Sequence, residues 1–350
     1  MRSVLLESEN PISALRLEQL HRVVSPGPVL ILTHDNPDPD SLASGMALGE
    51  LLSSAWQIEY RLVFSGLIAR AENRAMLELL TPAWEFRDQL PDFDHYSAVA
   101  LVDTQPGAGN NRFPRDRVPD VVIDHHNPLQ DNLVSVPYAD VRPEIGSTST
   151  LLYQYFEATD IIPDPGLATA LFYGLHTDTL GLARGSVVAD EIAYFNLLAL
   201  LDREKLVQVE QAGVQREYFL AFNRCLQAAR LYGKAVVAYL GEMHRPDLTA
   251  EMADVLIRLD TARAALCLGT HDGILYLSLR TKLVWKDAGV LAQTLVAGLG
   301  KAGGHGAIAG GQVPLADDEG GELAQEIQRR FLNLMGETGQ GEPMLKDEQV

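Results

Sequence analysis

The chain has 350 residues, of which 47% are hydrophobic, and carries a formal net charge of −19. This length and apolar content predict two folded domains and exclude a disordered protein. The charge disfavours tight binding to long DNA or RNA, whereas a short anionic substrate is compatible with it if metal ions neutralise the site locally. No stretch approaches the ~20 apolar residues of a membrane span and the first ten residues lack the features of a signal peptide, so we expect a cytoplasmic protein without membrane contact.

The first two hundred residues alternate short apolar runs with helical patterns. An amphipathic helix is predicted near residues 11–24, and four apolar runs follow, at residues 29–32, 60–64, 98–102 and 121–123. Runs of this kind, separated by helices, are typical of an α/β fold with a parallel sheet and helices on both faces. Ligands of such sheets bind beyond the carboxyl ends of the strands.

Acidic residues and histidines stand where three of these runs end, and Asp178 follows a later helix predicted at residues 167–175. The full set is His34, Asp38, Asp40, Asp103, Asp124, His125, His126 and Asp178. Asp38 and Asp40 could instead cap a helix, and His34 could do the same. So many carboxylates on one rim would destabilise the fold without cations. Mixed histidine and carboxylate ligation favours Mn²⁺, Fe²⁺ or Zn²⁺, and two such ions ~4 Å apart can activate a water and hold phosphate oxygens.

The second half of the chain predicts a smaller α/β domain. We expect one continuous helix over residues 203–231 as the connector, followed by strands at 235–240, 264–268 and 274–279 and helices at 248–259, 290–299 and 322–335. The glycine-rich segment 300–311 is expected to be a loop whose backbone can approach an anion. Residues 337–350 are polar and predict a flexible tail. Cys225 and Cys267 lie among apolar residues and are expected to be buried thiols.

These motifs resemble the DHH/DHHA1 phosphoesterase superfamily, whose name matches Asp124-His125-His126. The first motif of that family matches His34, Asp38 and Asp40 in spacing, and the others match Asp103, Thr177-Asp178-Thr179 and Gly303-Gly304-His305. The resemblance extends from about Pro28 to Met335. It implies a helix at residues 1–26 packed on a DHH domain at 27–202, a connector at 203–231 and a DHHA1 domain at 232–336.

The resemblance also implies a role for each matching residue. One metal ion would be held by His34, Asp38 and Asp103, and the second by Asp40, Asp103, His125 and Asp178, with Asp103 bridging. His126 would contact the scissile phosphate and Asp124 would orient the histidines. The substrate would also contact Arg280, Gly303, Gly304 and His305. The expected cofactor is two divalent ions, with Mn²⁺ as the first choice, and a homodimer is the expected assembly.

The function implied by the resemblance is hydrolysis of short nucleotides such as pGpG, pApA or pAp, as in the nanoRNase and pAp phosphatase branch. Two alternatives stay open: a cyclic di-AMP phosphodiesterase, and a catalytically inactive nucleotide sensor. The net charge disfavours a processive exonuclease, and the glycine-histidine motif near residue 304 is not expected in a manganese pyrophosphatase. Two further features stay open: the cluster Arg70, Glu72, Asn73 and Arg74, and His176, which is interpreted as structural but stands next to the fourth motif.

Overall fold

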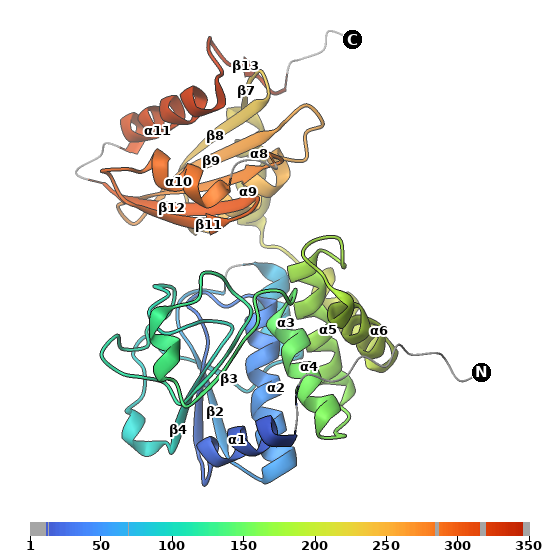
Figure 1. The fold of residues 1–350 in the computed structure, drawn as a ribbon. Helices are drawn as coiled ribbons and strands as arrows, with labels where there is room; N and C mark the ends of the chain where they lie inside the picture. The colour runs from blue at the N-terminus through green and yellow to red at the C-terminus, as the bar shows by residue number, and fades with distance from the viewer. Residues whose placement is uncertain (1–11, 13, 69, 284–286, 316–319, 346–350) are drawn as a thin grey trace. The chain divides into compact units, whose positions relative to one another are not determined.

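The computed structural model describes residues 12, 14–68, 70–283, 287–315 and 320–345 (Figure 1). The chain divides into two compact units, residues 1–212 and 213–350. The division lies inside the predicted connector. That segment forms two helices, α7 (Arg203–Glu210) and α8 (Arg216–Ala228), so the prediction of one continuous helix is wrong. Gly213 lies in the break, and glycine is a poor helix former.

The first unit contains a six-stranded sheet in which every neighbouring pair is parallel, with the order β3-β2-β1-β4-β5-β6. The strands are β1 (Val29–Leu32), β2 (Tyr60–Phe64), β3 (Trp84–Phe86), β4 (Ala98–Val102), β5 (Val121–Asp124) and β6 (Tyr138–Val141). The predicted α/β class with a parallel sheet is confirmed. All residues of β1, β4 and β5 are buried, which explains their continuous apolar sequences. The edge strands β3 and β6 are short or half-buried and were not predicted.

The described α-helices of the first unit pack on one face of this sheet, so the prediction of helices on both faces is wrong for this unit (Figure 1). Besides α7, they are α1 (Ala14–Val24), α2 (Pro39–Trp56), α3 (Ala71–Leu79), α4 (Thr148–Ala158), α5 (Pro165–Thr179) and α6 (Val188–Leu200). Loops and short 3-10 helices cover the opposite face instead. The apolar cluster on the opposite face includes Phe113 and residues of the short 3-10 helices η1 (Phe93–His95) and η2 (Asp131–Ser135). Among the described helices, none has the length and apolar content needed to cross a membrane.

The strand order places the reversal of the sheet between β1 and β4. From β1 the chain moves outward to β2 and β3, and it then returns to β4 on the other side of β1. Loops that leave β1 and β4 therefore diverge and leave a crevice between them, where ligands of such sheets bind. His34 follows β1 and Asp103 follows β4, so the fold itself places both residues at this crevice.

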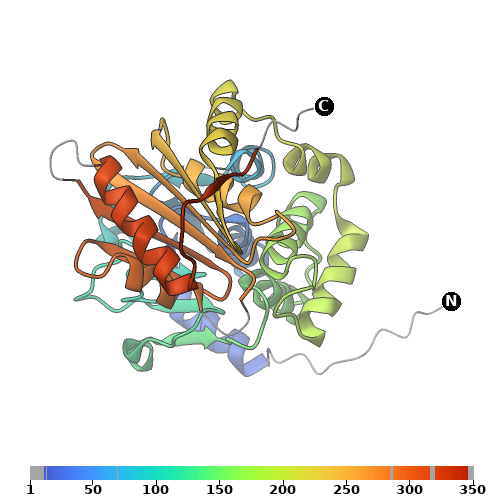
Figure 2. The same cartoon turned by 90° about the horizontal axis from the view of Figure 1, so that it is seen from above.

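The second unit contains a seven-stranded mixed sheet with the order β11-β12-β10-β9-β8-β7-β13. Its main strands are β7 (Arg230–Tyr232), β8 (Ala235–Glu242), β9 (Ala264–His271) and β10 (Ile274–Thr281). Helices α8 and α9 (Leu248–Leu256) pack on one face, and α10 (Ala288–Leu295) and α11 (Gly320–Met335) pack on the other. Figure 2 shows α11 running along its face of the sheet.

Two expectations for the second unit are corrected. The predicted loop at 300–311 is a hairpin of β11 (Lys301–His305) and β12 (Ile308–Pro314), because glycines remove the alternating pattern that marks a strand. The predicted flexible tail is attached as far as it is described, to residue 345. Its β13 (Glu342–Pro343) pairs with β7, and the carboxylate of Glu337 accepts a hydrogen bond from the backbone N–H of Lys234 at 2.9 Å.

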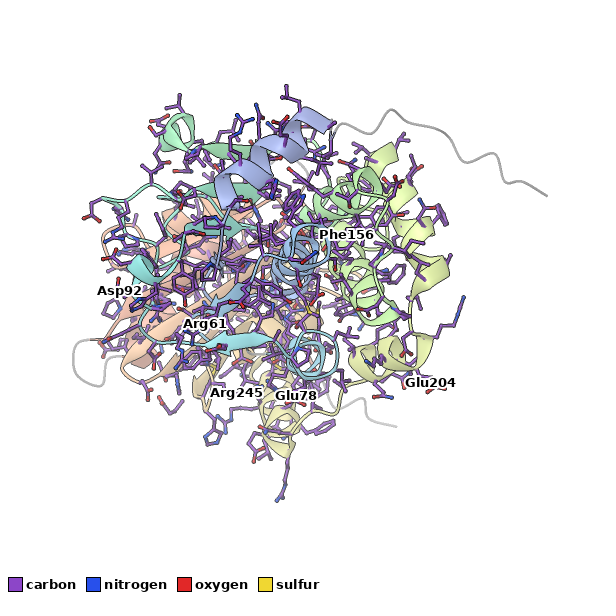
Figure 3. All side chains as sticks on the ribbon, turned by 90° about the horizontal axis from the view of Figure 1, so that it is seen from below. Arg61, Glu78, Asp92, Phe156, Glu204 and Arg245 are labelled. Carbon is purple, nitrogen blue, oxygen red and sulfur yellow. The ribbon has the colours of Figure 1, made fainter. Side chains whose placement is uncertain are left out.

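A substitution of Phe156 on α4 tests how the helices pack on the sheet. Phe156 is only 2% exposed and lies among the core residues (Figure 3). We expect Phe156→Ala to lower the free energy of unfolding by about 3–5 kcal/mol, through lost burial and the cavity left behind. Phe195→Ala is the matched control, since Phe195 on α6 is 60% exposed and its loss should cost less than about 1 kcal/mol. Urea denaturation measures both, and equal losses would contradict the described core.

Candidate metal centre

Three groups of ligand-type side chains meet beyond the carboxyl ends of β1, β4 and β5. The groups are His34, Asp38 and Asp103; Asp40, His125 and Asp178; and Asp103, His125 and His126. Within each group the candidate ligand atoms lie within 4.8 Å of one another. Asp103 joins the groups, because its Oδ2 is 3.6 Å from His34 Nε2 and its Oδ1 is 3.8 Å from His125 Nε2. The structure thus brings together all six residues predicted as metal ligands.

Backbone carbonyls set the orientation of two histidines. His34 Nδ1 lies 2.9 Å from the carbonyl oxygen of Asp35, and His125 Nδ1 lies 3.2 Å from that of Ile145. A carbonyl only accepts hydrogen bonds, so Nδ1 must donate and Nε2 faces the carboxylates. Nε2 of His125 and Oδ2 of Asp103 are buried without a hydrogen-bond partner. Because a buried polar atom left without a partner is costly, each of these two atoms suits the position of a ligand to a divalent cation.

Asp103 has an unusual backbone conformation that turns the chain at the end of β4. Its φ of 60° lies in the left-handed region, where aspartate and asparagine are tolerated better than other side chains. Its N–H donates to the carbonyl oxygen of Ile123 at 2.9 Å, and Thr148 Oγ1 donates to its Oδ1 at 2.8 Å. The side chain is fully buried, so its place between the histidines is fixed from several sides.

The amino terminus of α4 supports Asp40, which lies in the first turn of α2. Its two carboxylate oxygens accept hydrogen bonds from the backbone N–H groups of Thr148 and Ser149, at 2.7 and 2.8 Å. The positive end of a helix favours a negative charge at this place. Gly174 on α5 allows the close approach, because a Cβ there would lie 2.5 Å from Ser149 Oγ and 3.0 Å from Asp40 Cα. Neither α4 nor Gly174 was predicted to take part.

A second polar group orients His126. Its Nδ1 lies 2.8 Å from Asp124 Oδ1, and Gln105 Nε2 donates to Asp124 Oδ2 at 2.7 Å and to the carbonyl oxygen of His126 at 2.9 Å. This arrangement fits the predicted orienting role of Asp124. Gln105 was missed, because a single glutamine in a loop follows no periodic pattern and only its burial against Asp124 reveals it.

The crowded carboxylates shift the pKa values of the metal-free site. Burial raises the pKa of Asp40 well above its usual value, and the charges of Asp103 and Asp178 add to the effect. Burial opposes the protonation of His34 and His125, but neighbouring carboxylates outweigh it and raise the pKa of both imidazoles well above the usual value. The same balance raises the pKa of His126 to about 9. Folding without a cation therefore favours the protonated form of these histidines.

The other predicted site residues lie in different surroundings. Arg280 on β10 is buried in the second unit, where its guanidinium contacts Asp254 and donates from Nη1 to the carbonyl oxygen of Leu279 at 3.1 Å. Gly303 and Gly304 lie on β11, and the side chain of His305 is outside the described residues. His176 Nδ1 lies 3.1 Å from the hydroxyl of Tyr194, as expected of a structural histidine. The cluster of Arg70, Glu72, Asn73 and Arg74 surrounds the start of α3.

Fold and site together define an α/β domain that is arranged to bind divalent cations at the edge of its sheet. Residues 28–175 match the N-terminal domain of the DHH family. This match agrees with the resemblance that the Asp124-His125-His126 motif led us to expect.

Two relatives illustrate its similarity to known proteins. An uncharacterized protein of Methanocaldococcus jannaschii is 32% identical over 318 residues, which are 90% of this chain and 63% of that protein. A probable manganese-dependent inorganic pyrophosphatase of Streptococcus agalactiae is 27% identical over 193 residues, which are 53% of this chain and 58% of the pyrophosphatase. The chain therefore spans less than two thirds of the length of either relative.

One solved structure has the same fold over nearly the whole chain. The crystal structure of an exopolyphosphatase-related protein from Bacteroides fragilis matches with a TM-score of 0.71 and 15% sequence identity. The match covers 93% of this chain and 98% of that one. At this identity the likeness establishes the α/β architecture of both units.

The raised pKa values predict a pH-dependent stability of the metal-free protein. A histidine whose pKa is raised by folding stabilises the fold below about pH 6.5, and this contribution is lost as the pH rises through the folded pKa. Because folding raises the pKa of His126 to about 9, we expect the melting temperature in chelator to fall between about pH 6.5 and 9. With Mn²⁺ at 100 times its Kd, stability should rise by about 2.7 kcal/mol. Calorimetry measures both, and a metal-free melting temperature that is constant or rises over this range would contradict the prediction.

Proposed function

We propose that the protein is a phosphoric ester hydrolase that uses two divalent cations, with Mn²⁺ as the preferred ion, to hydrolyse short nucleotides. The observation that supports this most strongly is the carboxylate of Asp103, which is shared between two groups of ligands and has a buried oxygen without a partner. Two cations at such a site supply Lewis acidity and an activated water for attack on phosphorus.

The chain's own residues would divide the remaining work. One cation would be held by His34, Asp38 and Asp103, and the other by Asp40, Asp103, His125 and Asp178. His126 has the most exposed side chain of the three histidines, at 35%, and its partner Asp124 keeps its Nδ1 protonated. When the ring of His126 is protonated, its Nε2 can donate a hydrogen bond to a phosphate oxygen.

The net negative charge of the protein favours short nucleotides over long nucleic acids as substrates. With a net charge of −19, the protein repels a long phosphate backbone, whereas the cations attract one or two phosphates locally. Linear dinucleotides such as pGpG and pApA, and the mononucleotide pAp, fit this requirement. Cyclic di-AMP fits it as well and is the alternative substrate. The pyrophosphatase similarity makes inorganic pyrophosphate the compound that should be compared with them.

Asp103→Asn tests the shared ligand. Asparagine keeps the size of the side chain and tolerates the left-handed backbone, but it removes the bridging charge. We expect Mn²⁺ affinity to fall at least about 100-fold and hydrolysis to fall with it, while the metal-free protein stays folded. Calorimetric titration and turnover measure the two effects. Asp116→Asn, at an exposed acid, is the matched control, and unchanged turnover in Asp103→Asn would refute the two-cation mechanism.

A substrate panel tests the reaction class. We expect the Mn²⁺-loaded protein to release mononucleotides from pGpG or pApA, or phosphate from pAp, because two cations suit in-line displacement at phosphorus. Product chromatography distinguishes these from cleavage of cyclic di-AMP. Hydrolysis of pyrophosphate alone would replace the nucleotide proposal, and tight nucleotide binding without any turnover would identify an inactive sensor instead.

A further inference from the structure

The loop of residues 180–187, between α5 and α6, adjoins the metal centre, and none of the roles above uses it. It begins directly after the last turn of α5, which carries Asp178, and Asp178 Oδ2 lies 3.2 Å from His125 Nε2. The loop includes one cationic side chain, Arg184.

The guanidinium of Arg184 is fixed beside this ligand residue. Its Nε and Nη2 donate to the carbonyl oxygen of Asp178 at 3.2 and 2.6 Å. The residue is exposed, and among the described residues it forms no ion pair with an acid. Arg112 differs, because its Nε lies 3.4 Å from Asp35 Oδ1 and its charge is partly neutralised. Arginine offers five N–H donors, so Arg184 keeps donors and a full charge for an anion.

The backbone of the loop is held in a conformation that leucine does not favour. Leu180 and Leu182 have φ values of 51° and 69°, in the left-handed region where a branched side chain crowds the backbone. Thr179 maintains the turn, since its Oγ1 accepts from the N–H of Leu182 at 3.0 Å and its carbonyl oxygen accepts from the N–H of Arg184 at 2.8 Å. This turn brings Arg184 back next to Asp178. Strained backbone conformations that the surrounding structure holds in place are concentrated at functional sites.

The charge of the centre shows why a substrate needs such a residue. Five carboxylates, Asp38, Asp40, Asp103, Asp124 and Asp178, contribute −5, and two divalent cations contribute +4, which leaves −1. Two divalent cations would neutralise the scissile phosphate, whereas a second phosphate farther away would find no surplus of positive charge.

We propose that Arg184 binds a terminal phosphate of the substrate, outside the scissile phosphate, and gives the site its preference for terminally phosphorylated short nucleotides. This inference rests on the proposed function. The guanidinium keeps its two hydrogen bonds to Asp178 and offers its remaining Nη donors to the phosphate.

Kinetics of Arg184→Ala on pApA and on ApA, which lacks the terminal phosphate, test the inference. We expect KM for pApA to rise about 10-fold or more with kcat within twofold, while KM for ApA is unchanged, because a hydrogen bond to a charged group is lost for one substrate only. Arg184→Lys should fall between, because it keeps the charge without the fork. Arg203→Ala, at an exposed arginine on α7, is the matched control.

Other outcomes overturn the inference. Equal changes for both substrates, or a lower Mn²⁺ affinity in calorimetry, would show that Arg184 only positions Asp178. No change for either substrate would show that the phosphate binds elsewhere. If the unaltered protein hydrolyses neither compound, the proposed function fails. In that case, calorimetry would compare the binding of pApA and ApA to the Mn²⁺-loaded protein. If Arg184 binds the terminal phosphate, the unaltered protein should bind pApA more tightly than ApA, and Arg184→Ala should lose this preference.

Discussion

The site depends on electrostatic repulsion among carboxylates that the fold places together. Asp40 and Asp103 are fully buried, and Asp178 is close to both through His125. A protein gains nothing from such an arrangement unless a positive charge occupies it, because each buried carboxylate raises the pKa of the next. Protonated histidines supply that charge in the metal-free state, and divalent cations supply it more strongly. The preference for cations therefore follows from the packing of the sheet, and the surrounding hydrogen bonds hold the acids in place.

The backbone performs much of this work. The N–H groups at the start of α4 bind Asp40, and carbonyl oxygens in the loops after β1 and β6 orient His34 and His125. The left-handed turn at Asp103 directs its side chain between them. These supports come from elements on both sides of the crevice. A change in any helix that moves a backbone group by a fraction of an ångström would therefore reach the cations, even where no ligand is altered.

The sequence indicates the candidate ligands more clearly than the groups that support them, for a physical reason. Buried parallel strands are continuous apolar runs, and an acid at the end of such a run stands out, which is how Asp103 could be found. Supports such as Gln105, Gly174 and the N–H of Thr148 act through contacts between distant segments, and a single sequence has no periodicity that marks them. The same limit explains the second unit, where the sequence predicts a loop in place of the hairpin of β11 and β12 because its glycines hide the strand pattern. The prediction of one continuous connector helix is wrong for a local reason. The helical propensity around Gly213 is too low to continue the helix.

The spread of the ligands along the chain has a consequence for biosynthesis. The first candidate ligand is His34 and the last is Asp178, at the end of α5. The candidate site is therefore complete only when the chain through α5 has left the ribosome and folded. An emerging chain that contains β1 to β5 already holds most of the acids but lacks both α4, which supports Asp40, and Asp178. Cations acquired at that stage would be bound incompletely, and correct loading follows the folding of the first unit as a whole.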